Sequence, residues 1–111
     1  MVKFQAAAAD RTFHALADQT RRAVLESLRE QPGQSVSQLA APLCVKLPSM
    51  MKHLDVLDDA GLITRSKSGR TVAVHLTPEP MRDALDWLSR YERFWTVSLD
   101  RLVAYVEQDP K

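Results

Sequence analysis

The sequence predicts one mainly helical (α+β) domain, residues 1–111, built from five helices and a two-stranded β-hairpin. Three observations support this fold class. Apolar residues recur at three- and four-residue spacing through most of the chain, which is typical of amphipathic helices. One segment, residues 62–76, instead combines β-branched residues with partial alternation around Gly69. The length of 111 residues, 45% of them hydrophobic and 26% charged, suits a single globular domain.

Two helices are predicted in the first third of the chain. The first covers about residues 5–17, where an alanine-rich stretch continues into an apolar face. The second covers residues 20–30, with Asp18 as its N-cap. Arg21 and Arg22 lie at the start of this helix, where the helix dipole disfavours cations. We therefore expect a carboxylate or a phosphate nearby, or else a salt bridge or simple solvation.

A short third helix is predicted to open at Ser35, because Ser35 and Gln38 have the spacing of a capping box. Pro42 should end this helix, since proline cannot donate to a helical hydrogen-bond ladder. A turn of a few residues then leads to Pro48, which suits the first turn of a fourth helix. Two helices joined by such a tight turn are the helix-turn-helix arrangement.

The fourth helix, residues 47–57, has the pattern of a recognition helix. Its apolar side chains share one face, and the outer face is basic and able to form hydrogen bonds. The polar residues of the outer face are Ser49, Lys52, His53 and Asp55. A helix of about three turns is short enough to lie in the major groove of DNA. His53 has a second interpretation, a hydrogen bond across the helix-turn-helix core, and Asp55 either accepts from cytosine or repels phosphate.

Residues 62–76 are predicted to form the wing of a winged helix, a hairpin whose loop contains Gly69. No acidic residue stands between Gly61 and Pro78, and three cations lie on or beside the hairpin tip. These cations are Arg65, Lys67 and Arg70. Such a tip suits contacts with phosphates or with the minor groove. The alternative is an exposed edge hairpin whose charges prevent edge-to-edge aggregation.

Helical periodicity returns over residues 78–107, and a helix of roughly 27 residues would be about 40 Å long. Its apolar stripe is wider than this small domain can cover, so we expect a dimerisation helix that pairs with a second copy. The residues expected to dimerise are Leu88, Tyr91, Trp95, Leu99 and Leu102. The predicted fold is thus a winged helix-turn-helix dimerised through its terminal helices. The alternative is a helix packed only on its own domain.

The net charge of +1 hides an asymmetry along the chain. Residues 1–77 carry ten Lys and Arg against seven Asp and Glu, whereas residues 78–111 carry five against seven. The basic part coincides with the part that we expect to face DNA. No stretch has the length of a membrane-spanning helix and the N-terminus lacks a signal pattern, so we expect a cytoplasmic protein.

Cys44 is the single cysteine, which excludes an intramolecular disulfide and a cysteine-rich metal site. We expect it to be a small buried hydrophobe. A redox-responsive repressor acting through the Cys44 thiol, beside the recognition helix, is the alternative. The sequence has no glycine-rich phosphate loop and no nucleophile with evident His and acid partners. We therefore expect neither an enzyme nor a cofactor.

Several motifs taken together resemble the ArsR-type winged-helix repressors. They are Phe13–Arg22, Val36–Ala40, Leu47–Ser49 with Lys52–Leu54, Ala60–Ile63 and Gly69-Arg70. The resemblance covers about residues 12–107 and implies a homodimeric repressor on a pseudo-palindromic DNA operator. It implies DNA contacts from the recognition helix, from the turn before it and from the wing. These contacts are Ser49, Lys52 and His53 on the helix, Lys46 at the turn, and Arg65, Lys67 and Arg70 on the wing.

Two residues depart from the family pattern. Gln19 stands where the family often has proline, and Met51 stands where serine is common. Gln19 lies in the first turn of a helix, so we expect little effect on the fold. Met51 shifts the expected base readout to Ser49, Lys52 and Asp55.

The resemblance also bears on the signal that the protein senses. Family members that sense metals use paired cysteines near the third helix, or Asp and His sets on the last helix. Cys44 has no cysteine partner and residues 76–111 contain no histidine, so we predict no family-type metal site. An unknown small-molecule effector is a possible partner. The alternative function is a winged-helix dimer that serves as a protein-interaction module, which the salt dependence of binding would distinguish from DNA binding.

Overall fold

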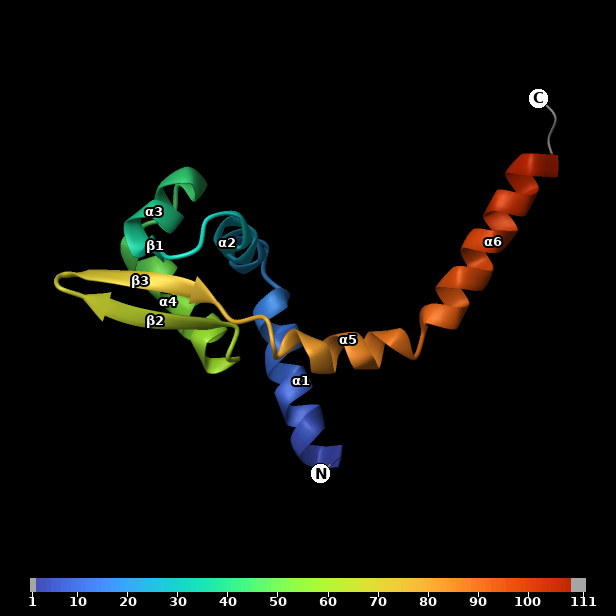
Figure 1. The fold of residues 1–111 in the computed structure, drawn as a ribbon, viewed down its shortest axis with the longest axis horizontal. Helices are drawn as coiled ribbons and strands as arrows, with labels where there is room; N and C mark the ends of the chain where they lie inside the picture. The colour runs from blue at the N-terminus through green and yellow to red at the C-terminus, as the bar shows by residue number, and fades with distance from the viewer. Residues whose placement is uncertain (1, 109–111) are drawn as a thin grey trace.

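Four helices, a hairpin and two further helices follow one another along the chain (Figure 1). The computed structural model describes residues 2–108, and the side chains of residues 7–107. The helices before the hairpin are α1 (Val2–Leu16), α2 (Gln19–Glu30), α3 (Val36–Ala40) and α4 (Leu47–Asp59), with a 3-10 turn η1 (Ala41–Leu43) after α3. The strands are β1 (Gln34–Ser35), β2 (Ile63–Ser68) and β3 (Thr71–Leu76), and the last helices are α5 (Met81–Ser89) and α6 (Glu92–Gln108). The predicted mainly helical α+β fold is confirmed.

The local helix signals act as the sequence predicts. Asp18 caps α2, since its carboxylate accepts from the backbone N–H of Arg21 at 3.0 Å. The capping box at α3 is complete: the Ser35 hydroxyl accepts from the Gln38 N–H, and the Gln38 side chain accepts from the Ser35 N–H. Gly61 follows α4 with φ +74°, the left-handed conformation that glycine adopts without strain.

The wing belongs to a three-stranded antiparallel sheet in the order β1-β3-β2, not to a hairpin alone. The short strand β1 pairs Gln34 with Val74 on β3, and Arg65 on β2 pairs with the same Val74 from the other side. Gln34 is buried, and its amide donates to the carbonyl oxygens of Ser27 and Gln31 at 2.9 Å. These bonds attach the base of the wing to the end of α2.

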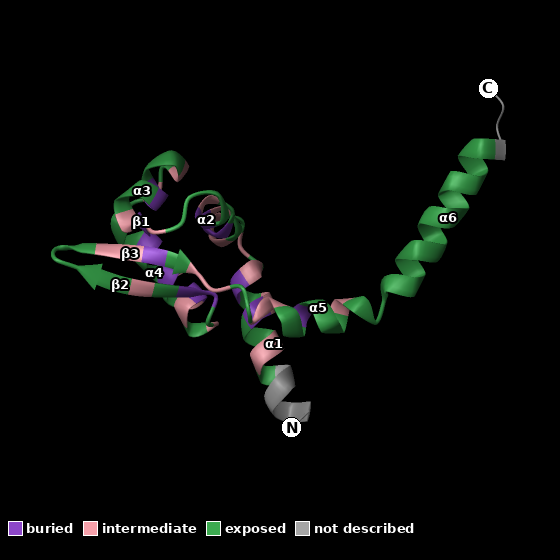
Figure 2. Cartoon of the chain, in the orientation of Figure 1, coloured by how far each residue is buried: buried purple, intermediate pink, exposed green. Residues whose placement is uncertain are grey.

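The hydrophobic core lies between α2, α4 and the base of the sheet (Figure 2). Its largest fully buried side chains include Leu28 of α2, Met50, Leu54 and Leu57 of α4, and Ile63 and Val74 of the sheet. Because α4 buries one entire stripe here, its opposite face is held at a fixed orientation.

The predicted single helix over residues 78–107 is corrected, because the chain turns at Arg90 and Tyr91 and so forms α5 and α6. The described residues 2–108 therefore contain six α-helices and not five. The N–H groups of Arg90 and Tyr91 donate to carbonyls three residues back, a tighter turn than an α-helix, at 3.2 and 3.0 Å. In addition, the Ser89 hydroxyl donates to the Asp86 carbonyl at 2.6 Å, a bond that competes with the helical ladder.

The two last helices differ in their surroundings. Helix α1 packs against α5, where Phe13 meets Trp87 edge to face with ring centroids 5.7 Å apart. In contrast, α6 projects away from the domain (Figure 1). The radius of gyration is 18.5 Å, whereas a compact chain of this length has about 13 Å. Among the described helices, none has both the length and the apolar character needed to span a membrane.

Candidate nucleic-acid interface

The outer face of α4 is the centre of the candidate interface. Pro48 lies in the first turn of the helix, and the Lys46 carbonyl accepts from the Met50 N–H at 2.9 Å. Since Met50 and its apolar neighbours point into the core, Ser49 and Lys52 are left exposed on the opposite side. Lys46, the residue before the helix, is exposed as well. The fold therefore brings together a hydroxyl and two ammonium groups along one short helix and its N-terminus.

The turn between α3 and α4 contains the one non-glycine residue with positive φ among the described residues, Cys44 at +54°. The Cys44 N–H donates to the Ala41 carbonyl, and the Val45 N–H donates to the Ala40 carbonyl. The expectation of a buried Cys44 is wrong, because the thiol side chain is exposed. The sharp reversal needed between the two helices places this residue at the outside of the turn.

The wing tip carries two exposed cations, Lys67 on β2 and Arg70 in the turn. Gly69 has φ +62°, and no atom lies within 4 Å of the position that a Cβ would occupy there. The backbone conformation, and not crowding, is therefore what favours glycine at the tip. The open tip leaves both cationic side chains accessible to a large partner.

Arg65, predicted as a wing contact, is engaged by carboxylates of α4. Its Nε and Nη2 atoms donate to Asp58 Oδ2 at 3.1 and 2.7 Å. Its Nη1 atom donates to Asp55 Oδ1 at 3.1 Å. The two hydrogen bonds that Arg65 donates to Asp58 are the largest cause that raises the pKa of its guanidinium, and the one that it donates to Asp55 adds to them against the opposing effect of burial. Asp55, for which the sequence left two interpretations, thus has an intramolecular partner.

His53 lies beside the N-cap of α2, with Nδ1 3.7 Å from Asp18 Oδ2. Its side chain is 24% exposed, so it faces the helix-turn-helix core more than solvent. The backbone hydrogen bond from Arg21 lowers the pKa of the Asp18 carboxyl, and the charges of Arg21 and His53 lower it further. The second interpretation of His53 is a hydrogen bond across the helix-turn-helix core; the structure shows instead a longer, 3.7 Å approach to the Asp18 carboxylate.

The side chains of Arg21 and Arg22 donate to backbone carbonyls at the end of α1. The Arg21 guanidinium donates to the carbonyls of His14 and Ala15 at 2.9 and 2.8 Å, and Arg22 donates to the Leu16 carbonyl at 2.8 Å. These carbonyls form the end of α1, where the helix dipole favours cations. The adjacent end of α1 therefore offsets the unfavourable position at the start of α2. Because only Ala17 and Asp18 separate the two helices, the start of α2 must lie close to the last carbonyls of α1, and this short connection could have been read from the sequence.

Most of the predicted dimerisation residues are exposed in the single chain, and Figure 2 shows that α6 is exposed along its described length. Leu88 is partly buried, whereas Tyr91, Trp95, Leu99 and Leu102 are 43%, 59%, 60% and 58% exposed. Tyr91 contacts Trp87 of α5 and Phe94 of α6, with ring centroids 5.1 and 6.4 Å apart. These aromatic contacts lie across the bend between α5 and α6.

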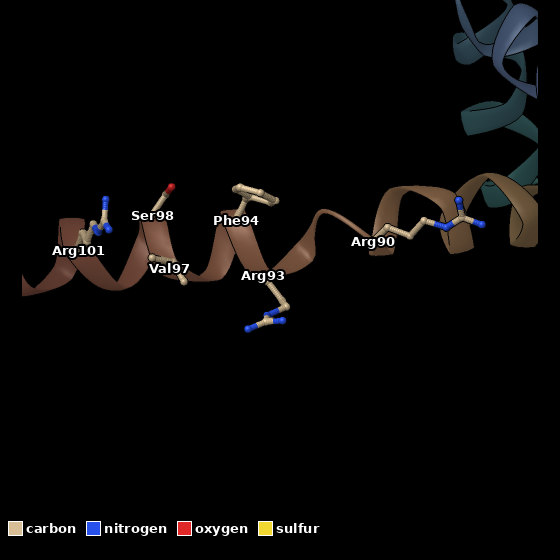
Figure 3. Close-up of a pocket in the computed structure, with 6 residues that line it drawn as sticks. All are labelled: Arg90, Arg93, Phe94, Val97, Ser98 and Arg101. Atoms are coloured by element: carbon tan, nitrogen blue, oxygen red, sulfur yellow. The ribbon is translucent and has the colours of Figure 1, made fainter.

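An open depression of about 570 Å³ lies at the junction of α5 and α6. It is lined by Arg90, Arg93, Phe94, Val97, Ser98 and Arg101. Figure 3 shows Arg93 on the opposite side of the helix from Phe94, and Arg90 extended toward α5. Since the arginines do not converge, the depression offers no set of aligned groups to a small effector. Within residues 2–108, the structure contains no group of three or more His, Cys, Asp or Glu side chains suited to a metal ion.

Comparisons with known proteins place the chain among helix-turn-helix transcriptional regulators. A family model described as a helix-turn-helix domain matches residues 16–66, from the end of α1 to β2. The HTH-type transcriptional regulator Rv2034 of Mycobacterium tuberculosis is 35% identical over 103 residues, 90% of this chain and 90% of that protein. The transcriptional repressor SdpR of Bacillus subtilis is 25% identical over 79 residues, 71% of this chain and 87% of that protein.

Solved structures give the same result. The crystal structure of an ArsR family transcriptional regulator is 38% identical to this chain, with a TM-score of 0.69. The match covers 85% of this chain and 93% of that one.

Proposed function

The chain belongs to the ArsR-type winged helix-turn-helix transcriptional regulators, and from this premise we propose that it is a homodimeric repressor of a pseudo-palindromic operator. As a member of this family it is a DNA-binding regulator and not an enzyme. The observation that carries the proposal is the exposed basic face of α4 beside the exposed cations of the wing. The repressor role is supported by SdpR, a relative that is named a transcriptional repressor.

The proposed DNA contacts divide between the two elements. Ser49 and Lys52 enter the major groove with α4, and Lys46 contacts phosphate at the turn. Lys67 and Arg70 contact phosphates or the minor groove from the wing. His53, of the family's expected contacts, is proposed to hold α4 against the start of α2, because its imidazole lies 3.7 Å from the Asp18 carboxylate.

The proposed dimer uses the apolar face of α5 and α6. Single proteins rarely leave a large apolar patch exposed, and such patches mark interaction sites. Burying Trp95, Leu99 and Leu102 against a second copy would remove this surface from water. Two recognition helices related by a two-fold axis would then meet half-sites about 34 Å apart.

The proposal includes no metal requirement. Cys44 is the single cysteine, and residues 76–111 have no histidine, so the ligand sets that metal-sensing relatives use are incomplete. An organic effector or a constitutive mode of repression is the proposed alternative to a metal signal.

The test is a fluorescence anisotropy titration with DNA from upstream of the protein's own gene, at two salt concentrations. Each protomer would place four cations against DNA, namely Lys46, Lys52, Lys67 and Arg70. If each of the eight in the dimer displaces counterions as a phosphate contact does, the logarithm of the binding constant should fall with a slope of about −7 against log salt. Added zinc or a chelator should leave the affinity unchanged. Binding lost on adding zinc, or on adding the chelator, would show a metal site and would contradict this part of the proposal.

The matched variants are Lys52→Ala and Arg29→Ala. Lys52 is a proposed DNA contact, whereas Arg29 is an exposed cation of α2 that pairs with Glu26 at 3.2 Å. Lys52→Ala should weaken binding and make the salt slope less steep, and Arg29→Ala should do neither. Equal losses for both variants would indicate non-specific attraction. No salt-dependent binding to any tested DNA would favour the protein-interaction module.

A further inference from the structure

Arg65 connects the wing to the recognition helix, and this connection carries a further inference. The Arg65 guanidinium lies between Asp55 and Asp58, with three hydrogen bonds of 2.7 to 3.1 Å. Asp55 and Asp58 are three residues apart on α4, so they share one face of the helix. We call this group, Arg65 with Asp55 and Asp58, the wing bridge. It is a polar link between the two elements of the proposed DNA interface.

The position of Arg65 along β2 makes the wing bridge a structural boundary. Arg65 pairs with Val74, at the level where β1 also joins the sheet through Gln34. Beyond Ser66 and Ala73 the sheet narrows to the two strands of the hairpin tip. The wing bridge therefore lies one level before the end of the three-stranded part of the sheet, from which the tip extends.

Residues at every second position of β2 point to the same side of the sheet. Ile63 on this side is buried in the core, Arg65 reaches the α4 carboxylates, and Lys67 is exposed. The row thus runs from the core through the wing bridge to a proposed phosphate contact. A change in the wing bridge would move Lys67 relative to α4.

The wing bridge also changes the charge of the proposed DNA-facing surface. The C-terminal half of α4 carries Asp55, Asp58 and Asp59, which would repel phosphates. Arg65 places one positive charge between two of these carboxylates. A guanidinium held in this way has fewer N–H groups left for a phosphate.

We infer that Arg65 is a positioning residue, which sets the wing at a fixed angle to α4 so that Lys52 and Lys67 reach the same DNA duplex. It is not itself a phosphate contact. This inference rests on the proposed DNA-binding function. The wing bridge would be the contact that keeps α4 and the wing in one arrangement for binding the same DNA.

The decisive variant is Asp58→Asn, because the two roles of Arg65 predict opposite results. A positioning role predicts weaker operator binding, roughly three- to thirtyfold, although the variant removes a negative charge near DNA. A phosphate-contact role predicts stronger binding, since Arg65 would be released and a repulsive charge removed. Asp59→Asn is the matched control, because Asp59 is an exposed aspartate of α4 outside the wing bridge. It should leave binding unchanged or slightly stronger.

A double-mutant cycle with Arg65→Gln completes the test. For a positioning role, the double variant with Arg65→Gln and Asp58→Asn should lose no more affinity for DNA than Arg65→Gln alone. Both variants should keep the salt slope of the wild type. For a phosphate contact, Arg65→Gln should make the slope less steep by about two for a dimer. Stronger binding by Asp58→Asn, or that change of slope, would overturn the inference.

Hydrogen exchange without DNA separates this inference from the proposed function. If the wild-type protein binds no DNA, the proposed function fails, but amides of residues 66–72 still report on the wing bridge. Exchange at these amides should rise by roughly threefold or more in Arg65→Gln and Asp58→Asn, and not in Asp59→Asn. Exchange equal to that of the wild type in both bridge variants would overturn the inference. A rise over the whole chain would mean general unfolding and would overturn it as well.

Discussion

The DNA-facing part, residues 18–76, and the arm formed by α5 and α6 show the same apolar periodicity with opposite results. In α4 the periodic residue Leu54 is 0% exposed, whereas Trp95 and Leu102 in α6 are 59% and 58% exposed. The difference is the presence of a partner within the chain. Helix α4 has α2 and the sheet to pack on, and α6 projects away from both (Figure 2). Periodicity therefore predicts a helix, but not what covers it.

This contrast divides the sources of stability. The DNA-facing part buries its apolar surface within one protomer, so its stability should depend little on protein concentration. Helix α6 of the arm gains burial only when something covers it, whereas α5 already packs on α1. We propose that a second copy covers α6. Variants in the DNA-facing part should therefore change the free energy of unfolding, and variants in the arm should change dimerisation.

The largest effect is expected from Leu54→Ala. Removing a fully buried leucine leaves a cavity and should lower the free energy of unfolding by about 2–5 kcal/mol. Urea unfolding at two protein concentrations should give the same loss. Leu47→Ala is the matched control on the same helix, because Leu47 is 50% exposed and should change stability by less than about 0.5 kcal/mol. Equal effects of the two variants would remove the distinction between the faces of α4.

Trp95→Ala should act on assembly and not on the folded domain. A large aromatic side chain at the centre of an interface typically contributes about 2–4 kcal/mol, so the dimer should dissociate roughly 30- to 1000-fold more readily. Sedimentation equilibrium measures this change. Thr96→Ala, the neighbouring polar position on α6, is the control. A Trp95→Ala protein that dimerises like the wild type would contradict the proposed role of the arm.

Signals that act within four residues could be predicted from the sequence. The Asp18 cap and the box of Ser35 and Gln38 both depend on nearby backbone groups, and the structure confirms both. The exposed basic residues of α4 and the wing tip follow from the same local patterns. The outline of the candidate interface was therefore predictable.

Contacts between distant segments could not be predicted in the same way. Gln34 pairs with Val74, forty positions later, and no short pattern in the sequence specifies that contact. Arg65 was expected to contact DNA because its charge matches phosphate, but the fold brings Asp58 within 2.7 Å. The partner of a cationic side chain depends on the tertiary structure, and the local sequence around Arg65 does not specify it.

The bend in the arm was missed for a different reason. Trp87, Tyr91 and Phe94 keep helical spacing across the bend, so the pattern shows no interruption there. The tighter hydrogen bonds of Arg90 and Tyr91 are what separate α5 from α6. Cys44 was misplaced because free cysteines are usually buried, whereas the turn before α4 leaves this one outside.

Arg70→Ala should change DNA binding and leave the dimer intact, whereas Trp95→Ala should change the dimer. The loss of a charged phosphate contact at the wing tip should weaken operator binding by roughly tenfold, and should make the salt slope less steep by about two for a dimer. Anisotropy titrations over a range of salt measure both quantities. The dimer should remain intact by sedimentation. A variant that lost the dimer together with DNA binding would show that the two parts are not independent.

Ser35→Ala should have a smaller effect, confined to the start of α3. The alanine cannot accept the Gln38 N–H, and the loss of such a cap costs about 1 kcal/mol. Because β1 ends at Ser35, the base of the wing should also exchange hydrogen faster. Ser37→Ala is the matched control, since Ser37 lies within α3 and takes no part in the capping box. A similar loss in both variants would argue against the cap as the cause.

The smallest effect concerns Asp18, which links the start of α2 to His53 of the recognition helix. The backbone N–H of Arg21 holds the pKa of the Asp18 carboxyl below its ordinary value of 3.8, and the charges of Arg21 and His53 act in the same direction. A carboxyl whose pKa is lower in the folded state stabilises the fold above its unfolded pKa, and this stabilisation is lost as the pH falls through the folded value. Asp18→Asn keeps an oxygen that can accept the same hydrogen bond but does not titrate. In urea unfolding, the wild type should have a higher free energy of unfolding than Asp18→Asn at pH 7, and this difference should shrink at pH 3. Asp18→Ala, which loses the cap, should be less stable than Asp18→Asn at both pH values. An advantage that stayed the same at pH 3 would mean that the Asp18 charge contributes nothing beyond its hydrogen bond.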